Sequence, residues 1–385
     1  EIQNVVPVAL VTANTEFHGI AVRHPVESVS VDWNIIKNIG GAADAFMSYG
    51  IGVLQGSGGA LPVYVEGLSF CHNEIAGVSG YQACDGIFLG ACSKVHVDYN
   101  IIHGVYHDPL IIGAAIWVAD PSVAAQKDRI SICHNEIGGG SGTTRPPGYL
   151  LSYGIAVAQL NVSTINNLLI EGNQCDRDID VGGSFIMVLA NGKNVTIKHN
   201  QHWFSDGHET GVGIYVSPVS TTVENVMIDQ NEAYGEYIVD FILVLESSVV
   251  HVADNIQKGF NGILAYGDGI TLLECSHIDV HDNQIEECYP DSTTGKALIR
   301  IVDCTFGSVH DNVLRGPSGA FNIESLRFED TGPATPLCTD LHIHDNKISP
   351  RGTVGPPLVY DIGFYGAIPG SFGTDMTIWA NIFGI

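Results

Sequence analysis

The chain has 385 residues, 45 of them glycine, and carries 42 acidic against 16 basic side chains for a formal net charge of −26. This balance excludes a continuous basic surface, so we expect no nucleic-acid partner and no attraction to anionic membranes. We also expect no membrane insertion, because no run of 18 apolar residues exists and the most apolar stretch, residues 237–250, is interrupted by Asp240 and Glu246.

The first 25 residues predict a partial coil that ends in a short strand at residues 18–22. In later coils a strand of the form Gly-Ile-x-Val or Gly-Ile-x-Leu comes first, as at residues 50–53, 86–89, 154–157, 213–216 and 269–272. A second strand and a third, shorter strand follow it. Short runs of valine, isoleucine and leucine separated by glycine, asparagine and aspartate are typical of β-structure, so we expect an all-β chain.

The second strand leads to an asparagine in the frame apolar-x-apolar-x-x-Asn-x-apolar, which is plainest at residues 68–75. The asparagines recur every 31 residues or so, a period that predicts a stacked solenoid of about 12 coils. Period-two alternation turns the apolar positions to the interior, and stacked asparagines can bond one another from coil to coil. The twelve asparagines are Asn34, Asn73, Asn100, Asn135, Asn173, Asn200, Asn231, Asn255, Asn283, Asn312, Asn346 and Asn381.

Nine cysteines are present, and their positions in the repeat argue against disulfides. Cys71 and Cys133 share one position two coils apart, roughly 9.6 Å at about 4.8 Å per coil, whereas a disulfide needs Cα atoms within about 7 Å. We expect reduced, structural thiols, which leave the redox compartment open. A ladder of buried thiols is expected at the position just before the second strand, shared by Cys92, Cys275, Cys304 and Cys338.

Insertions follow the third strand in many coils and therefore precede the glycine-led strand. A solenoid accepts insertions on one side because its strands stay in register, so we expect these segments to overhang the face of the glycine-led strands. They cover residues 40–49, 103–114, 138–153, 175–183, 203–211 and 289–296, whereas residues 331–337 form a separate loop after a glycine-led strand.

Three short strands per coil, an asparagine ladder after the second and long insertions before the first resemble the single-stranded right-handed parallel β-helix family, the pectate-lyase-like superfamily. The resemblance covers about residues 18–385 and implies a single right-handed parallel β-helix domain over residues 1–385. Because the chain starts at Glu1 without an initiator methionine, we expect a fragment or processed part of a longer protein. The family contains polysaccharide lyases, glycoside hydrolases, uronan epimerases and phage tailspikes. It therefore implies a polysaccharide partner and an extracellular, cell-surface or virion-surface location, but no particular reaction.

In enzymes of this family the substrate groove lies on the outer face of the first strand. Alternation predicts one outward residue at the centre of each such strand, namely Ala21, Gly52, Phe88, Trp117, Ala156, Met187, Tyr215, Leu243, Thr271, Arg300 and Arg327. Phe88, Trp117 and Tyr215 could stack on sugars or be covered by loops or a neighbouring subunit. Arg300 and Arg327, about 4.8 Å apart on adjacent coils, could bind a carboxylate or sulfate. Alternatively, they could pair with local acids such as Asp303, Glu324, Glu329 and Asp361.

Glycosidic cleavage commonly uses two carboxylates about 5–9.5 Å apart. The segment 206–209 supplies Asp206, His208 and Glu209 as candidate catalytic residues, although acidic loops are also ordinary solvated turns. Acids on neighbouring coils could meet the same separation: Asp176, Asp178, Asp180, Asp240 and Asp268. Of these we take Asp176 and Asp240 as further catalytic candidates. The arginine motif of pectate lyases and the paired-aspartate and Gly-His-Gly motifs of polygalacturonases are absent, so those activities in their familiar form are not expected.

The outward face of the second strand carries histidines on three consecutive coils near the C-terminal end of the sequence. Alternation places the following side chains outward: Asp279 and His281, Ser308 and His310, His342 and His344. Stacked imidazoles can bind a transition metal, which makes His281, His310 and His344 candidate ligands, or they can form a polar solvent face. We expect no required cofactor. Ca²⁺ would suit the acidic excess, although no Gly-Gly-x-Gly-x-Asp repeat is present.

We expect a protein that acts on polysaccharide, as a glycoside hydrolase, lyase or epimerase, through a groove on the first-strand face between Phe88 and Arg327. The alternative is a non-catalytic surface fibre, adhesin or tailspike-like shaft. In that case the aromatic stripe would be buried in a homo-oligomer such as a trimer, and the oligomeric state separates the two hypotheses.

Overall fold

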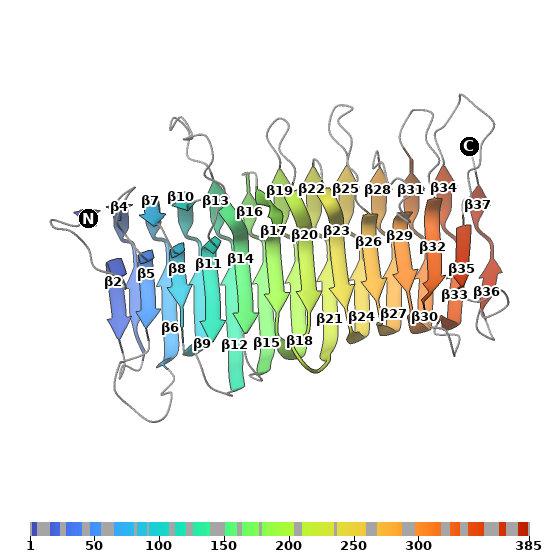
Figure 1. Ribbon diagram of the computed structural model, residues 1–385, viewed down its shortest axis with the longest axis horizontal. Helices are drawn as coiled ribbons and strands as arrows, with labels where there is room; N and C mark the ends of the chain where they lie inside the picture. The colour runs from blue at the N-terminus through green and yellow to red at the C-terminus, as the bar shows by residue number, and fades with distance from the viewer. Residues whose placement is uncertain are drawn as a thin grey trace.

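A computed structural model of the chain shows three parallel β-sheets wound into an elongated solenoid, whose coils stack along the long axis in sequence order (Figure 1). The expected right-handed parallel β-helix is confirmed, with one strand per sheet in each coil. The structure describes residues 2–5, 16–23, 28–40, 47–54, 65–80, 83–90, 92–107, 112–120, 126–138, 151–159, 164–176, 179–203, 210–234, 237–258, 268–286, 297–316, 324–331, 338–349, 362–366 and 376–383. Within these ranges no helix is long and apolar enough to cross a membrane.

The first sheet contains the glycine-led strands and has 12 members. They are β2 (Glu16–Arg23), β5 (Met47–Leu54), β8 (Ala83–Leu89), β11 (Ile112–Asp120), β14 (Leu151–Gln159), β17 (Ile179–Leu189), β20 (Thr210–Ser217), β23 (Tyr237–Leu245), β26 (Asp268–Leu273), β29 (Ala297–Val302), β32 (Glu324–Asp330) and β35 (Ile362–Gly366). Of the expected overhanging insertions, residues 41–46, 108–111, 139–150, 177–178, 204–209 and 289–296 lie outside the described ranges.

Strands of the first sheet turn two successive residues into the core. Ile87 is fully buried, and Gly86 before it also faces inward, because a Cβ there would lie 2.5 Å from Cγ2 of the core residue Ile102. Other coils fill the glycine position with core side chains, namely Ala115, Phe185, Phe241 and Leu298. As in a β-bulge, the pair interrupts alternation. Residues three apart across it, such as Asp268 and Thr271, therefore share the outer face and contact each other.

The second sheet also has 12 strands, and each of them precedes the ladder asparagine of its coil. Its members are β3 (Ser30–Asp32), β6 (Val65–Cys71), β9 (Cys92–Asp98), β12 (Gln126–Cys133), β15 (Thr164–Glu171), β18 (Asn191–Lys198), β21 (Val223–Asp229), β24 (Ser247–Ala253), β27 (Ser276–His281), β30 (Thr305–His310), β33 (Thr339–His344) and β36 (Thr377–Trp379). Its apolar rows point inward, as Val95 and Val97 of β9 do.

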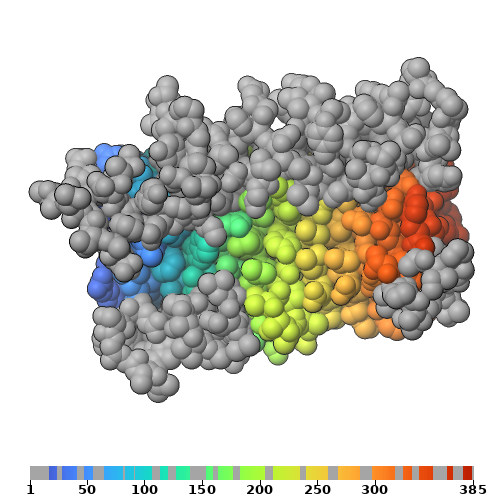
Figure 2. Space-filling model, in the orientation of Figure 1, coloured from blue at the N-terminus to red at the C-terminus, as the bar shows by residue number. Residues whose placement is uncertain are grey.

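The third sheet has 13 strands, most of them short. They are β1 (Ile2–Val5), β4 (Ile35–Ile39), β7 (Glu74–Gly80), β10 (Ile101–His107), β13 (Glu136–Gly138), β16 (Gln174–Cys175), β19 (Gln201–Trp203), β22 (Glu232–Tyr234), β25 (Ile256–Lys258), β28 (Gln284–Glu286), β31 (Val313–Arg315), β34 (Lys347–Ser349) and β37 (Ile382–Phe383). The described residues of successive coils follow one another along the surface in sequence order (Figure 2).

The asparagine ladder runs as expected along the corner between the second and third sheets. At Asn173, for example, both the backbone N–H and the side-chain Nδ2 donate to Oδ1 of Asn200, at 3.0 and 2.9 Å. The Asn173 side chain also donates to the Ile132 carbonyl at 2.8 Å. Each ladder asparagine from Asn34 to Asn346 bonds the next in this way, so the buried amides satisfy one another and lock the register of the coils.

The expected thiol ladder is present at the C-terminal end of the second sheet. The backbone N–H of Cys275 donates to the sulfur of Cys304 at 3.4 Å, and burial raises the pKa of the Cys338 thiol to about 11. Cys71 and Cys133 are separated by Asp98 in the register, which agrees with the expected two-coil spacing. These thiols are therefore structural, as small core side chains.

Candidate functional site

The outer face of the first sheet carries two rows of side chains that run along the solenoid. The central row has the expected register, because each residue from Ala21 to Arg327 pairs with the next one in the list given above. Three residues earlier in each strand, across the inward pair, lies the leading row. It consists of His18, Tyr49, Asp85, Ala114, Tyr153, Ser184, Val212, Asp240, Asp268, Ala297 and Glu324.

The N-terminal half of this face is apolar and aromatic. The rings of Tyr49 and Phe88 have centroids 4.8 Å apart, and Trp117 meets Tyr153 edge to face at 5.9 Å. Trp117 and Tyr215 pack at the border of a small surface cluster that includes buried Met187. The aromatic stripe is thus partly covered by its own neighbours, while Phe88, Trp117 and Tyr215 stay half-buried.

Among the described residues that form the two rows of this apolar half, Asp85 is the one acid. Its side chain is 2% exposed, and Oδ1 accepts a hydrogen bond from the Ala114 backbone N–H at 2.9 Å. Desolvation by burial raises the pKa of Asp85 to about 8, against the smaller opposing effect of that hydrogen bond. Asp85 is therefore neutral near pH 7. Sequence reasoning missed it, although Asp-Gly-Ile at residues 85–87 recurs at 268–270 and marks the leading row.

The C-terminal half of the same face is ionic. Asp240 and Asp268 occupy adjacent strands in register and are 2% and 0% exposed. The Asp268 backbone N–H donates to Asp240 Oδ1 at 3.3 Å. Asp268 in turn accepts from the Ala297 N–H at 2.5 Å and from the Thr271 hydroxyl at 3.1 Å. Two carboxylates thus lie one strand apart on the expected groove face.

Arg300 and Arg327 lie beside these acids and pair with glutamates. Arg300 binds Glu329 through Nε at 2.7 Å and Nη2 at 3.0 Å, and Arg327 binds Glu329 at 2.5 Å and Glu324 at 3.0 Å. Tyr365 donates to Glu324 and lies under the Arg327 guanidinium, 3.7 Å from ring centroid to Cζ. Of the two alternatives, the pairing with local acids is therefore realised, through Glu324 and Glu329.

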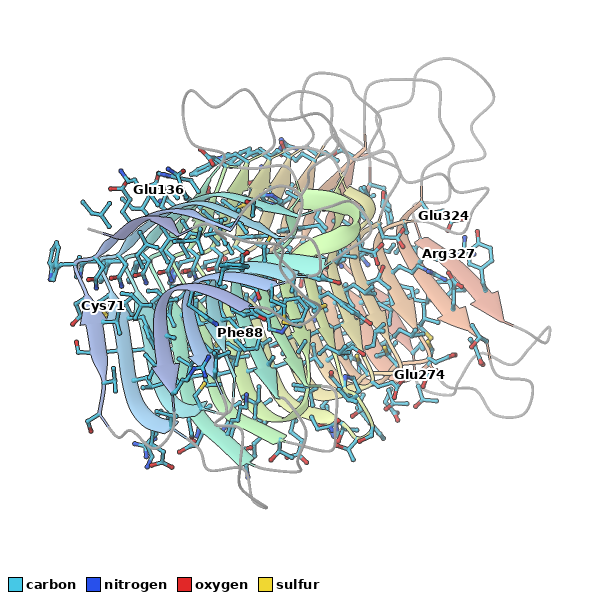
Figure 3. The ribbon with its side chains drawn as sticks, turned by 60° about the vertical axis from the view of Figure 1, so that its left-hand side comes forward. Cys71, Phe88, Glu136, Glu274, Glu324 and Arg327 are labelled. Atoms are coloured by element: carbon cyan, nitrogen blue, oxygen red, sulfur yellow. The ribbon has the colours of Figure 1, made fainter. Side chains whose placement is uncertain are left out.

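We call this group the acid–arginine cluster: Asp240, Asp268, Arg300, Glu324, Arg327, Glu329 and Tyr365. Arg300 Nη1 lies 3.9 Å from Asp268 Oδ2, which joins the aspartates to the arginine–glutamate network. Although desolvation opposes it, the two guanidiniums hold the pKa of Glu329 below its ordinary value. Likewise, against desolvation, Glu329, Asp268 and Asp240 hold the pKa of Arg300 above its ordinary value. Glu324 and Arg327 lie toward the C-terminal end of the solenoid and Phe88 toward the other (Figure 3).

The remaining catalytic candidates are Asp206, His208, Glu209 and Asp176. Asp206, His208 and Glu209 lie outside the described residues, so their placement is untested. Asp176 follows β16 of the third sheet, where its exposed side chain lies close to Gly138 of the preceding coil. It therefore comes from a different sheet than Asp240.

The three candidate metal ligands form a stacked column on the outer face of the second sheet. His281, His310 and His344 are in register, with ring centroids 4.9 and 4.8 Å apart and interplanar angles of 10° and 5°. The column continues onto Trp379, 4.5 Å from His344. The outward placement expected from alternation is thus observed.

Comparison with known proteins gives a distant structural likeness only. No protein-family model and no curated protein matches the sequence. Among solved structures, a GH136 lacto-N-biosidase from Eubacterium ramulus is similar with a TM-score of 0.40 and 11% sequence identity over 96% of this chain. The chain spans 61% of the length of that protein. At this level of similarity the neighbour identifies neither a reaction nor a substrate for the present chain.

Proposed function

We propose that the chain hydrolyses a glycosidic bond of a polysaccharide on the outer face of the first sheet, with Asp240 and Asp268 as the two carboxylates. The observation that carries the proposal is their in-register placement on adjacent strands beside Arg300. Neighbouring strands are about 4.8 Å apart, close to the separation of about 5–5.5 Å between carboxyl groups in retaining glycosidases.

The donors around Asp268 favour it as the ionised member of the pair. The Ala297 N–H and the Thr271 hydroxyl both donate to its carboxylate, and the Arg300 guanidinium lies 3.9 Å away. Asp268 would attack the anomeric carbon and form a glycosyl ester, while Asp240 gives its proton to the departing glycosidic oxygen. Asp240 would then take a proton from water, which attacks the ester and releases Asp268. Both carboxylates are buried, so this face must open to admit a sugar.

Two further features support the proposal, the first concerning the reaction and the second concerning the substrate. Arg300 and Arg327 are engaged by Glu329 and Glu324. Their charge therefore already has partners, whereas elimination needs a cation that neutralises a uronate carboxylate of the substrate. The aromatic side chains Phe88, Trp117 and Tyr215, on the N-terminal half of the same face, offer surfaces on which sugar rings could stack.

The test is product formation on a panel of neutral and acidic polysaccharides, followed by reducing-end assay and by absorbance near 235 nm. We expect the parent chain to produce reducing ends without absorbance at 235 nm. We expect Asp240→Asn and Asp268→Asn to produce no reducing ends. In Asp268→Gly, added azide should restore turnover and yield a glycosyl azide, because azide replaces the missing nucleophile. Absorbance at 235 nm would indicate an unsaturated product and therefore elimination in place of hydrolysis. Full activity in both Asn variants would show that Asp240 and Asp268 are not the catalytic carboxylates.

If no polysaccharide of the panel gave a product, this result would favour the alternative of a surface fibre, adhesin or tailspike-like shaft. The apolar N-terminal half of the face would then serve as an interface between copies. Sedimentation equilibrium tests this directly. A stable trimer that dissociates on Trp117→Lys or Tyr215→Lys would support the shaft.

A further inference from the structure

A second group of polar side chains lies on the outer face of the second sheet, apart from the acid–arginine cluster. His251, Asp279 and Ser308 are in register on β24, β27 and β30, and His281 and His310 form the next outward row. Asp279 therefore has His251 on the preceding coil, His281 two residues along its own strand and His310 diagonally on the following coil. We call His251, Asp279, His281 and His310 the histidine cluster.

The imidazole nitrogens of this cluster converge on one carboxylate. Asp279 Oδ2 lies 3.5 Å from His251 Nδ1 and 3.7 Å from His281 Nε2, and Asp279 Oδ1 lies 3.2 Å from His310 Nε2. The donor atoms of His251, Asp279 and His281 all lie within 4.8 Å of one another. Ligands held at about 2.0–2.2 Å around a tetrahedral ion are separated by roughly 3.4 Å. The distances from Asp279 to the three nitrogens are close to this value. His251, Asp279 and His281 form one group of donor atoms, and His310 approaches the same carboxylate from the following coil, so an ion would draw its ring toward the group.

The Nδ1 atoms of His281 and His310 each contact a carboxylate that fixes the orientation of the ring. The residue after each histidine is an aspartate, and its carboxylate lies 2.8 Å from Nδ1 in both His281–Asp282 and His310–Asp311. An Nδ1–H donated to a carboxylate leaves the Nε2 lone pair directed at Asp279, which is the arrangement that orients histidines in metal sites. Ser308 further positions the carboxylate by donating to Asp279 Oδ1 at 2.9 Å.

We propose that the histidine cluster binds one Zn²⁺-class transition-metal ion, with His251 Nδ1, His281 Nε2, His310 Nε2 and an Asp279 oxygen as ligands. Three nitrogens and one carboxylate oxygen suit a borderline-soft divalent ion better than Ca²⁺ or Mg²⁺, which take oxygen ligands. The ligands come from β24, β27 and β30, so the ion would clamp three consecutive coils at their outer face.

The neighbouring coil provides a built-in control. His344 repeats the same pattern, stacks on His310 at 4.8 Å and has Nδ1 2.9 Å from Asp345. It contacts Trp379 on its other side, and the described contacts give it no carboxylate equivalent to Asp279. His344→Gln therefore removes an equivalent imidazole and its carboxylate pair while leaving the proposed ligands in place.

The test is calorimetric titration of untagged protein with ZnCl₂, together with the visible absorption of Co²⁺ as a geometric probe. We expect one ion per chain, an intense tetrahedral Co²⁺ band and a rise in Tm with Zn²⁺ concentration. His281→Gln, His310→Gln and Asp279→Ala should each weaken binding on the order of 100-fold, and Asp282→Asn by about 10-fold. His344→Gln should bind as the parent chain does.

Three outcomes would overturn the site: no saturable binding by the parent chain below 100 µM Zn²⁺, unchanged affinity in His281→Gln and His310→Gln, or equal loss in His344→Gln. The last outcome would assign binding to the histidine column as a whole. These readouts do not depend on hydrolysis, so they are independent of whether the first-sheet proposal holds.

Discussion

The two halves of the first sheet's outer face place the same type of residue in opposite surroundings. Asp85 and Asp268 both belong to the leading row, both are buried, and each accepts a hydrogen bond from the backbone N–H of the next strand. Asp85 adjoins Tyr49 and Ala114 in the register, whereas Asp268 faces Thr271 and Arg300. The fold thus gives both acids an equivalent backbone N–H donor. The neighbouring side chains therefore determine the charge and the proposed role of each acid.

The comparison shows that the protonation state of a buried acid on this face depends on the side chains that surround it. Desolvation by burial raises the pKa of Asp85 to about 8, so this acid is protonated at neutral pH. At the other end, and despite burial, Arg300 and Arg327 hold the pKa of Glu329 below its ordinary value. One half therefore loses stability as the pH rises, and the other loses it as the pH falls.

The largest expected difference between the halves is in activity. Asp268→Asn should lower kcat by about 10⁴-fold, because it removes the group that attacks or stabilises the reacting carbon. The matched Asp85→Asn changes the same row and should leave kcat within about twofold. Initial rates on the best substrate of the panel, with circular dichroism to verify folding, measure both. Equal losses would show that the two halves are not functionally distinct.

The second prediction concerns pH and stability in the apolar half. The folded pKa of Asp85 is about 8 and the ordinary value is 3.8, so between these values the folded chain holds a proton that the unfolded chain releases. Stability should therefore fall with rising pH by up to about 1.4 kcal/mol per pH unit in this window. Asp85→Asn, which keeps an acceptor for the Ala114 N–H, should flatten that slope. Urea unfolding at pH 5, 6, 7 and 8 measures it, and an unchanged slope would contradict the assignment.

The third prediction concerns the ion pairs of the C-terminal half. Glu329→Gln leaves Arg300 and Arg327 without their shared carboxylate and should lower the free energy of unfolding by about 2 kcal/mol, less than for a fully buried pair. Because its folded pKa is lowered, Glu329 contributes stability above its unfolded pKa of about 4.3 that is lost as the pH falls further. This acid-side loss should shrink in the variant.

Glu66→Gln is the control for that experiment. Glu66 pairs with Lys94 at 2.5 Å, but both side chains are exposed. An exposed pair contributes only about 0.5 kcal/mol. Chemical denaturation at pH 7 compares the two variants, and a loss in Glu66→Gln as large as in Glu329→Gln would mean that the cluster is an ordinary surface network.

The smallest expected effect is on binding at the apolar half. Phe88→Ala or Trp117→Ala should weaken polysaccharide affinity about fivefold, the equivalent of about 1 kcal/mol for one aromatic contact. Trp33, which is 75% exposed and stacks on His72 at the opposite corner of the coil, is the control aromatic. Affinity electrophoresis of Trp33→Ala should match the parent chain. A loss of affinity in Trp33→Ala would instead place the sugar contact outside the first sheet.

Spacing alone predicted the solenoid, the ladder and the register of the central row, because these depend on a repeat that the asparagines display directly. The row from Phe88 to Arg327 has the expected order. The outward histidines were found in the same way. In each case the side chain follows strict alternation within a single strand.

The leading row could not be assigned by alternation, which places residues three apart on opposite faces. Asp268 contacts Thr271 and Glu324 contacts Arg327 only because two successive residues between them turn inward. The sequence does show two successive apolar residues in these strands, such as Phe241 and Ile242. That both face the core can be recognised only once the bulge is known. Pairing of Arg300 with Glu329 also depends on side-chain reach between coils, which no repeat pattern specifies.

The asparagine ladder gives this fold a tolerance that compact domains lack. Consecutive ladder asparagines are separated by as few as 24 residues, from Asn231 to Asn255, and as many as 39, from Asn34 to Asn73. The side-chain bond is nevertheless 3.0 Å in both cases. Coil length is therefore decoupled from coil stacking, and insertions can accumulate in the connections without disturbing the frame. New specificities can be acquired by exchanging connections one coil at a time, while the strands that hold the acids stay where they are.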